Sequence, residues 1–227
     1  MFPSDNLFTL LTEIEAPHAN QKNKILPFVF LRQAKSIIKK ENCEDKAMNI
    51  DEVREKKTAS KEIYKGHILD VYVDDVTLPS GRKTHREVIR HCHASAILAI
   101  NEKNEVILEE QYRYPYDDVR IELPAGKAEK GEDGLTTAKR EFEEETGYQA
   151  KEWKKLGTFY PSVAYTDEVI EIYLATGLTF KGQHLDAGEE LKYRFVPLEE
   201  VKERIKEDKI RDGKTLAGIL QYLLLNK

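Results

Sequence analysis

The chain has 227 residues, a length that allows one or two domains and a sizeable buried core. Its 36 Lys and Arg residues nearly balance 41 Asp and Glu residues, for a formal net charge of -5, so no basic surplus indicates nucleic-acid binding. Two cysteines without a CxxC motif argue against a disulfide scaffold or a zinc finger, and no apolar run approaches the roughly 20 residues that span a bilayer.

Residues 1–47 carry only weak patterns. Two apolar stretches hint at short helices, and Pro17 and Pro27 interrupt the region. The first thirty residues lack a basic segment followed by an uninterrupted apolar stretch, so we expect no secretory signal and a cytoplasmic location. We expect a poorly ordered extension here, with Met48 as an alternative start. The competing hypothesis is a helical appendage that packs on a dimer.

A β pattern begins near Ile63. Apolar and polar residues alternate over 69–74, which indicates a half-buried strand, and a Pro-Ser-Gly turn signal leads to a returning strand at 86–91. The sequence therefore predicts a hairpin. His91 and His93 occupy alternate positions and would share one face of a strand. Two histidines without a third ligand make a poor zinc site, so we interpret both as structural.

The remaining strands and helices follow from apolar patterns. The run at 94–100 is almost entirely apolar, which indicates a fully buried strand. A turn at 101–104 and a returning strand at 106–111 come next. Farther along, the sequence predicts three strands and then two helices with apolar stripes, at 153–159, 170–176, 191–196, 198–207 and 215–225.

The stretch at 119–148 holds the most chemistry. A short strand over 119–123 ends at Pro-Ala-Gly, and a lysine- and glycine-bearing loop follows. Asp133 is the predicted N-cap of a helix that ends at Gly147, where a glycine can adopt the left-handed conformation. On a helical wheel the apolar residues fall on one arc, which we expect to be buried: Leu135, Ala138 and Phe142.

Three carboxylates crowd the adjoining arc of this helix. Glu141, Glu144 and Glu145 are spaced i, i+3 and i+4, so they lie side by side and repel one another. A hard divalent cation such as Mg²⁺ would relieve the repulsion, since it prefers oxygen ligands. Arg140 lies four residues before Glu144 and can hold that carboxylate. On spacing alone, a solvated acidic helix face explains the charge run equally well.

Seven fixed positions of one pattern, G-x5-E-x7-R-E-U-x-E-E-x-G-U with U a bulky apolar residue, are all present: Gly126, Glu132, Arg140, Glu141, Glu144, Glu145 and Gly147. Phe142 fits the first U, and Tyr148 is a mild departure at the last. The stretch therefore resembles the Nudix box. The preceding Glu-Leu-Pro-Ala-Gly segment at 122–126 resembles the ADP-ribose pyrophosphatase branch of the Nudix hydrolases.

The resemblance implies an α+β fold: a Nudix-like α/β/α sandwich with a mixed central sheet, plus an N-terminal β-hairpin subdomain. It suggests an extension at 1–47, a β subdomain in dimer contact at 48–91 and a Nudix hydrolase domain at 92–227. In the resembling family the hairpin swaps across a homodimer, so we expect a homodimer. The other expected partner is a nucleotide-sugar substrate, with no nucleic acid and no membrane.

The implied reaction is metal-dependent hydrolysis of the diphosphate bond of a nucleoside diphosphate sugar, with ADP-ribose giving AMP and ribose 5-phosphate. Mg²⁺ is the implied cofactor, with Mn²⁺ as an alternative. By resemblance, Glu141 and Glu145 are the main metal ligands, Glu144 assists, and the Ala125 carbonyl completes the site. Arg140 joins the catalytic set because it supports the geometry of these groups.

The resemblance adds a loop glutamate to the catalytic and metal-binding set. Aligned on the strand and helix start that follow, Glu189 falls where the family has a glutamate that binds metal or activates water. A slip of one residue would assign this role to Glu190. The competing interpretation is a solvated loop pair, because polar loops are often merely exposed.

The resemblance also implies substrate contacts. Arg113 is a candidate contact to the diphosphate or the terminal ribose, and Arg86 is the other candidate phosphate contact, since a guanidinium group suits a phosphate. A surface ion pair is the competing interpretation of each arginine. Glu122 belongs to the substrate side of the site. Tyr165 and Asp167 keep the second half of the family's sugar-pocket loop. The first half departs from the family at 163–164, where Val-Ala replaces Pro-Gly, so a UDP- or GDP-linked sugar is an alternative substrate.

A non-catalytic module that senses ADP-ribose is the alternative from a different functional class. Such modules resemble Nudix hydrolases but often lose carboxylates of the box and gain a DNA-binding winged helix. This chain keeps the complete carboxylate set and shows no basic helix-turn-helix pattern. The sequence therefore predicts a hydrolase.

Overall fold

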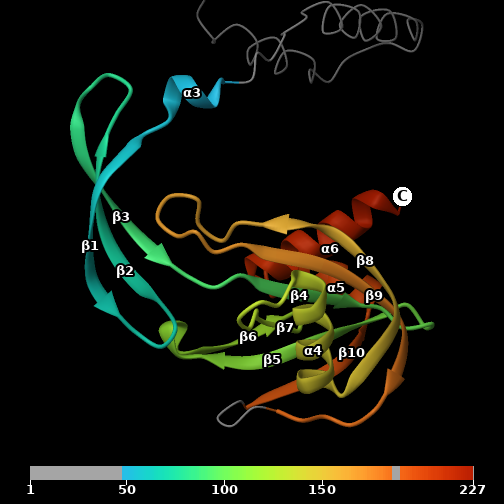
Figure 1. Cartoon of the computed structure of the whole chain (residues 1–227). Helices are drawn as coiled ribbons and strands as arrows, with labels where there is room; N and C mark the ends of the chain where they lie inside the picture. The colour runs from blue at the N-terminus through green and yellow to red at the C-terminus, as the bar shows by residue number, and fades with distance from the viewer. Residues whose placement is uncertain (1–47, 186–189, 227) are drawn as a thin grey trace, which may run out of the picture. The chain divides into compact units, whose positions relative to one another are not determined.

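The computed structural model describes residues 48–185 and 190–226. The chain divides into two units, Met1–Ile50 and Asp51–Lys227, and only residues 48–50 of the first unit are described. The expectations for residues 1–47 and for Glu189 therefore lie outside the described residues. A short helix, α3 (Ile50–Val53), crosses the division, and all the described strands belong to the second unit (Figure 1).

A three-stranded antiparallel sheet comes first in the second unit, with the order β1-β2-β3. Its strands are β1 (Lys56–Lys65), β2 (Asp70–Thr77) and β3 (Lys83–Arg90). The predicted hairpin is present as β2 and β3, joined by a turn in which Gly81 has φ 83°. The β structure begins at Lys56, earlier than predicted. The sequence did not indicate the start of β1 because every residue of this strand is exposed and the strand has no apolar period.

Two further sheets form the core. One is mixed, with the order β7-β4-β9-β8, and its strands β4 and β9 run parallel. The other is antiparallel, with the order β10-β5-β6. The bounds are β4 (Ala94–Ala99), β5 (Glu105–Arg113), β6 (Asp118–Glu122), β7 (Ala125–Lys127), β8 (Tyr148–Phe159), β9 (Ile170–Phe180) and β10 (Leu191–Pro197).

The chain changes sheets at the turn after β4. The predicted strand after that turn is present as β5, but β5 does not run back along β4. Strand pairing between β4 and β5 is limited to the isolated bridge between Ile100 and Val106, and β5 pairs with β6 and β10 instead. A 3-10 helix, η1 (Tyr114–Tyr116), separates β5 from β6. The pairing of β5 with β6 and β10 places Arg113, at the end of β5, in the lining of the cavity described below.

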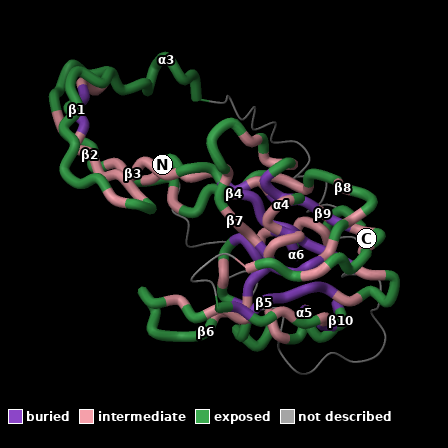
Figure 2. Tube along the Cα trace, turned by 60° about the horizontal axis from the view of Figure 1, so that its bottom comes forward, coloured by how far each residue is buried: buried purple, intermediate pink, exposed green. Residues whose placement is uncertain are grey.

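Helices cover the two faces of the central strands: α4 (Gly134–Thr146), α5 (Leu198–Lys206) and α6 (Gly213–Leu225). All six residues of β4 are buried, as predicted, and Figure 2 shows buried positions along β4, β5 and β9. Ile97 packs in one cluster with Ala138 and Phe142 of α4. Leu98 packs in another with Val201 of α5 and Ile219 of α6. Successive residues of one strand thus face different helical layers.

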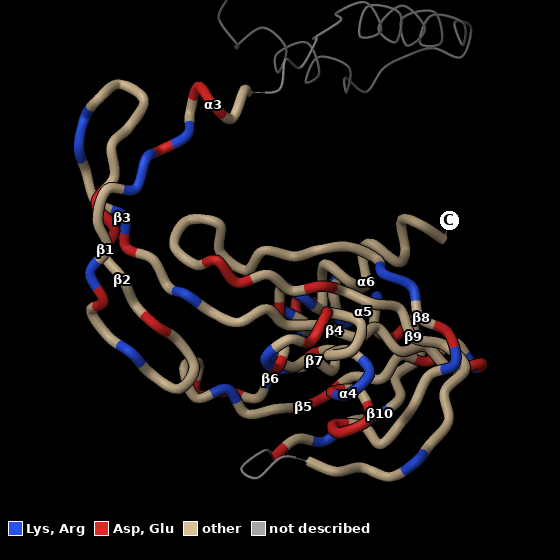
Figure 3. Tube along the Cα trace, in the orientation of Figure 1, with Lys and Arg blue, Asp and Glu red and all other residues tan. Residues whose placement is uncertain are grey.

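Charged residues of both signs occur along the described part of the chain. Acidic and basic residues are interspersed along the strands and helices (Figure 3). None of the described helices is both long enough and apolar enough to cross a membrane.

Candidate active site

Helix α4 carries the acidic residues and is fixed at both ends. Its N-cap, Asp133, accepts a hydrogen bond from the Thr136 N–H at 2.8 Å, and Gly147 ends the helix with φ 75°. Both ends agree with the prediction from the sequence. Beyond the C-terminus, the His184 N–H donates to the Glu144 carbonyl at 3.0 Å. This bond attaches the start of the following polar loop to the helix.

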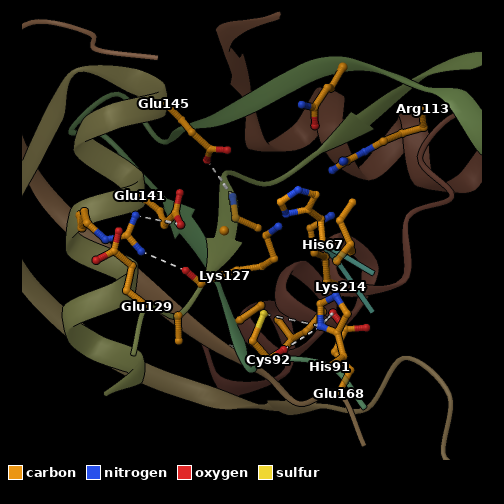
Figure 4. Close-up of a pocket in the computed structure, with 18 residues that line it drawn as sticks. His67, His91, Cys92, Arg113, Lys127, Glu129, Glu141, Glu145, Glu168 and Lys214 are labelled. Atoms are coloured by element: carbon orange, nitrogen blue, oxygen red, sulfur yellow. Dashed lines mark hydrogen bonds and ion pairs between the residues drawn. The ribbon is translucent and has the colours of Figure 1, made fainter. Parts of the chain in front are cut away.

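Glu141 and Glu145 lie one turn apart on α4 and line a cavity of about 650 Å³ (Figure 4). The Glu145 carboxylate is buried, and its Oε2 accepts a hydrogen bond from the Ala125 N–H at 2.9 Å. Glu141 Oε1 lies 3.0 Å from Arg140 Nη1. Two carboxylates on one cavity wall repel each other, and a bound cation would relieve that repulsion.

Gly126 leaves room for the Glu141 carboxylate because glycine has no Cβ atom. A Cβ atom added to Gly126 would lie 1.9 Å from Glu141 Cδ, well inside van der Waals contact. Glycine is therefore needed at this position, where strand β7 passes α4. The Nudix box has its first fixed glycine here, and the structure provides the steric reason.

Arg140 joins three acidic residues of the box, Glu132, Glu141 and Glu144, into one network. Its Nε and Nη2 donate to the two carboxylate oxygens of Glu132 at 2.9 and 3.0 Å, and its Nη1 donates to Glu144 Oε2 at 2.9 Å. Nη2 also donates to the Lys127 carbonyl at 2.9 Å. The hydrogen bonds from Arg140, together with one from the Glu129 N–H, lower the pKa of Glu132 to about 2. The guanidinium thereby keeps this carboxylate ionised and in place.

Basic residues line the same cavity. Arg113, at the end of β5, donates from Nε and Nη2 to both carboxylate oxygens of Glu122 at 2.7 Å. Lys214 of α6 donates to Glu122 Oε2, and to Asp212 Oδ2 at 3.1 Å. Burial raises the pKa of Glu122, but the hydrogen bonds and charges of Arg113 and Lys214 outweigh it and lower that pKa to about 2. The cavity thus joins carboxylates from α4 to cations from β5 and α6.

Comparison with known proteins assigns the chain to a family. The sequence pattern of the NUDIX domain matches residues 89–218, more than half of the chain. The chain belongs to the NUDIX family. The resemblance seen in the sequence is thereby confirmed, and with it the expectation of a Nudix pyrophosphatase type of enzyme. A second pattern, the nucleoside diphosphate sugar hydrolase N-terminal domain, matches residues 55–89.

Two curated relatives resemble most of this Nudix chain. The methanol dehydrogenase activator of Bacillus methanolicus is 41% identical over 175 residues, which cover 76% of this chain and 94% of the relative. The ADP-ribose pyrophosphatase of Bacillus subtilis is 38% identical over 177 residues, covering 77% and 95%. Among solved structures, an ADP compounds hydrolase superposes with a TM-score of 0.70 at 18% identity, covering 79% of this chain and 96% of that one. This last likeness concerns the fold, and it confirms the predicted α+β Nudix architecture.

The Nudix cavity offers oxygen ligands that suit a hard divalent cation. Within the described ranges, no group of three or more His, Cys, Asp or Glu side chains is arranged to hold a metal ion. Mg²⁺ usually binds through one or two carboxylates, with water and substrate phosphates completing its shell. The carboxylates of Glu141 and Glu145, next to the backbone of Ala125, fit that mode of binding.

Other residues expected in the Nudix site have different surroundings. Glu144 is bound by Arg140 and does not line the cavity. Asp167 accepts hydrogen bonds from the His91 N–H at 2.9 Å and from Arg90 Nη1 at 3.1 Å. Asp167 therefore ties its loop to the end of β3, and in this structure it does not line the cavity.

Arg86 and Tyr165 lie outside this cavity of their own chain. Arg86 Nη2 pairs with Glu55 Oε1 at 2.5 Å. Arg86 and Tyr165, both predicted to contact the substrate, line a separate hollow beside β2 and β3. Tyr165 is exposed. Glu190, the alternative to Glu189, is exposed just before β10.

The structure adds cavity residues that the sequence did not indicate. Lys214 is the most buried charged group among them, and its signal in the sequence was a lysine in the first turn of an apolar helix. His91, interpreted from the sequence as structural, lines the cavity, and its Nδ1 lies 3.7 Å from Glu168 Oε1. Additional lining residues not predicted from the sequence include His67, Gln111, Lys127 and Glu129.

Proposed function

We propose that this protein hydrolyses the diphosphate bond of a nucleoside diphosphate sugar in a metal-dependent reaction, with ADP-ribose giving AMP and ribose 5-phosphate. The observation that carries the proposal is that Glu141, Glu145 and Arg113 line one cavity. Carboxylates suit a divalent cation and a guanidinium suits a phosphate. A diphosphate needs both kinds of partner.

The chemical difficulty of the reaction is negative charge. Water must approach a phosphorus atom that anionic oxygens already surround. A divalent cation, Mg²⁺ or Mn²⁺ in its place, supplies positive charge and lowers the pKa of bound water. Glu141, Glu145 and the Ala125 carbonyl would hold it. Arg140 keeps Glu141 and Glu144 in position, and Arg113 orients the diphosphate from the other side.

The products follow from one displacement. The water oxygen forms a bond to one phosphorus atom, and the bond from that phosphorus to the bridging oxygen breaks. The bridging oxygen leaves with the second phosphate, so two phosphate monoesters result. One proton of the water goes to a carboxylate, for which the loop residue Glu189 is our candidate and Glu190 the alternative. If Glu189→Gln has no effect and Glu190→Gln lowers kcat strongly, the assignment belongs to Glu190.

ADP-ribose is the leading substrate because the relative from Bacillus subtilis is named an ADP-ribose pyrophosphatase. The match to a nucleoside diphosphate sugar hydrolase N-terminal domain supports the wider substrate class. A UDP- or GDP-linked sugar is the alternative, since the 163–164 segment departs from the family and Val163 is exposed. The complete carboxylate set of the box argues against a non-catalytic sensor. A homodimer and a cytoplasmic location remain predictions.

The test is product analysis over a panel of nucleoside diphosphate compounds with Mg²⁺ or Mn²⁺, including ADP-ribose, UDP-glucose and GDP-mannose. We expect ADP-ribose to give the highest kcat/KM, with AMP and ribose 5-phosphate as products. Glu145→Gln keeps an oxygen acceptor for the Ala125 N–H but removes the charge, so kcat should fall about 100-fold or more.

The matched control is Glu143→Gln on the same helix. Glu143 binds the Gln149 side chain at 2.9 Å and does not line the cavity, so its activity should stay within about twofold of wild type. Cleavage of no compound in the panel would refute the hydrolase. Undiminished cleavage by Glu145→Gln would refute the assigned metal ligands.

A further inference from the structure

Lys214 occupies a costly place for a cation. It lies in the first turn of α6, where the helix dipole disfavours positive charge, and its side chain is only 10% exposed. Burial adds a desolvation penalty to an ammonium group. A lysine at this position therefore gains little for the stability of the helix itself. The same residue lines the cavity that holds Glu141 and Glu145 (Figure 4).

The contacts of Lys214 aim its ammonium group. An ammonium has three N–H donors. One binds Glu122 Oε2 and a second binds Asp212 Oδ2 at 3.1 Å. No third partner for Lys214 is present within residues 48–185 and 190–226, so one donor is left for a ligand in the cavity that the residue lines.

Glu122 connects Lys214 to Arg113. Arg113 uses Nε and Nη2 on Glu122, which leaves its other N–H groups for a ligand. The buried carboxylate thus binds both cations, with its Oε2 accepting from each, and both cations line the cavity. The charges of Arg113, Lys214, Glu122 and Asp212 sum to zero, so loss of the lysine would leave this wall with a net negative charge beside an incoming anion.

We propose that Lys214 is a substrate-binding residue whose ammonium group donates to a non-bridging oxygen of the diphosphate, alongside Arg113. Glu122 is then a positioning residue that holds the two cations at a fixed separation. The identity of the natural ligand as a nucleoside diphosphate rests on the proposed function. The binding of a diphosphate anion to these two cations can be measured without it.

The experiment measures the binding of inorganic pyrophosphate by calorimetry to the full chain in EDTA. Removal of the divalent metal leaves the side-chain cations as the anion's partners. Lys214→Met keeps the length of the side chain and removes its charge, so the dissociation constant for pyrophosphate should rise about tenfold or more. Lys214→Arg should recover at least half of the loss on a logarithmic scale.

Lys209→Met is the matched control. It removes the same charge from an exposed lysine that pairs with Glu207 in the loop before α6, so pyrophosphate affinity should stay within about twofold. Lys214→Gln serves as the second neutral variant if Lys214→Met does not fold. With a cleaved nucleotide sugar, the neutral variants should raise KM more than they lower kcat.

Three results would overturn the proposal. One is an unchanged pyrophosphate affinity in a folded neutral variant, because a purely structural lysine would lower the melting temperature and leave affinity unaffected. A second is equal weakening in Lys209→Met. The third is no pyrophosphate binding to the wild-type protein. If no nucleotide sugar of the panel is cleaved but Lys214→Met still weakens pyrophosphate binding about tenfold, the proposed function is refuted and the anion-binding role of Lys214 is supported.

Discussion

A single missing Cβ atom at position 126 decides where the Glu141 carboxylate lies. Because an added Cβ would lie 1.9 Å from Glu141 Cδ, Gly126→Ala must displace the carboxylate or the strand. We expect kcat to fall about 100-fold, since a ligand moved by an ångström no longer holds its cation in the productive geometry. The measurement is steady-state kinetics with the best substrate of the panel, beside a thermal melt.

Gly81→Asn is the control for the glycine prediction. Gly81 lies in the hairpin turn with φ 83°, and no atom lies within 4 Å of the place that a Cβ atom would take there. Asparagine tolerates this backbone conformation better than most residues, so both activity and melting temperature should change little. A Gly126→Ala protein with wild-type kcat would contradict the steric account of the box glycine.

Glu122 makes the free energy of unfolding of the protein depend on pH in the acidic range. Its pKa lies at about 2 in the folded protein, against 4.5 for the free side chain. The ionised carboxylate therefore stabilises the fold above pH 4.5, and this contribution is lost as the pH falls toward 2. By pH 3 the loss should reach about 2 kcal/mol of the free energy of unfolding.

Urea denaturation at pH 6, 4.5 and 3 measures this loss. Glu122→Gln cannot gain a proton in that range, so the difference in unfolding free energy between wild type and variant should narrow as the pH falls. Glu132→Gln should show the same direction, because Arg140 lowers the pKa of Glu132 to about 2 as well. A difference that stays constant from pH 6 to pH 3 would contradict the account of Glu122.

At the scale of the element, α4 depends on its caps. The Asp133 side chain accepts the Thr136 N–H at 2.8 Å, and Asp133→Ala leaves that donor without its partner. We expect a loss of about 1 kcal/mol in the free energy of unfolding. Asp133→Asn keeps an oxygen acceptor and should lose much less. Chemical denaturation of the three proteins measures this, and equal stabilities would show that the cap contributes nothing.

The same helix shows what a sequence can predict. Asp133, Gly147 and the buried arc of Phe142 are local signals, because caps and helical periods involve residues only a few positions apart. Tyr148 departs from the box pattern, and the reason lies in residues far from it in the sequence. Its ring packs edge to face against Phe180 and Phe195. An aromatic residue fills the apolar position well there.

Contacts between distant segments could not be predicted in the same way. The pairing of β5 with β10 joins residues 80 to 92 positions apart, and no period in either strand specifies the partner. The contact between Lys214 and Glu122 spans 92 positions. Strand β1 was missed over 56–62 for a different reason, since a fully exposed strand has no apolar alternation.

At the scale of the whole molecule, the sheet of β1, β2 and β3 presents an unusual surface. All ten residues of β1 are exposed, including Ile63 and Tyr64. An exposed edge strand with apolar side chains is a site for association with another chain. Arg86 lies on this sheet and does not line the cavity that holds Glu141 and Glu145 in its own chain. We therefore predict a homodimer in which Arg86 binds substrate in the cavity of the partner.

Complementation between two inactive variants tests this arrangement. Arg86→Ala and Glu145→Gln should each lose activity, and light scattering at micromolar concentration should show dimers for both. If Arg86 acts across the dimer, one site of each mixed dimer carries both substitutions and the other carries neither. A refolded equal mixture should then recover about a quarter of the wild-type activity, because half of the dimers are mixed and half of their sites are intact. If Arg86 acts within its own chain, every site keeps one defect and the mixture recovers nothing. A monomer in light scattering, or full activity of Arg86→Ala alone, would refute the prediction.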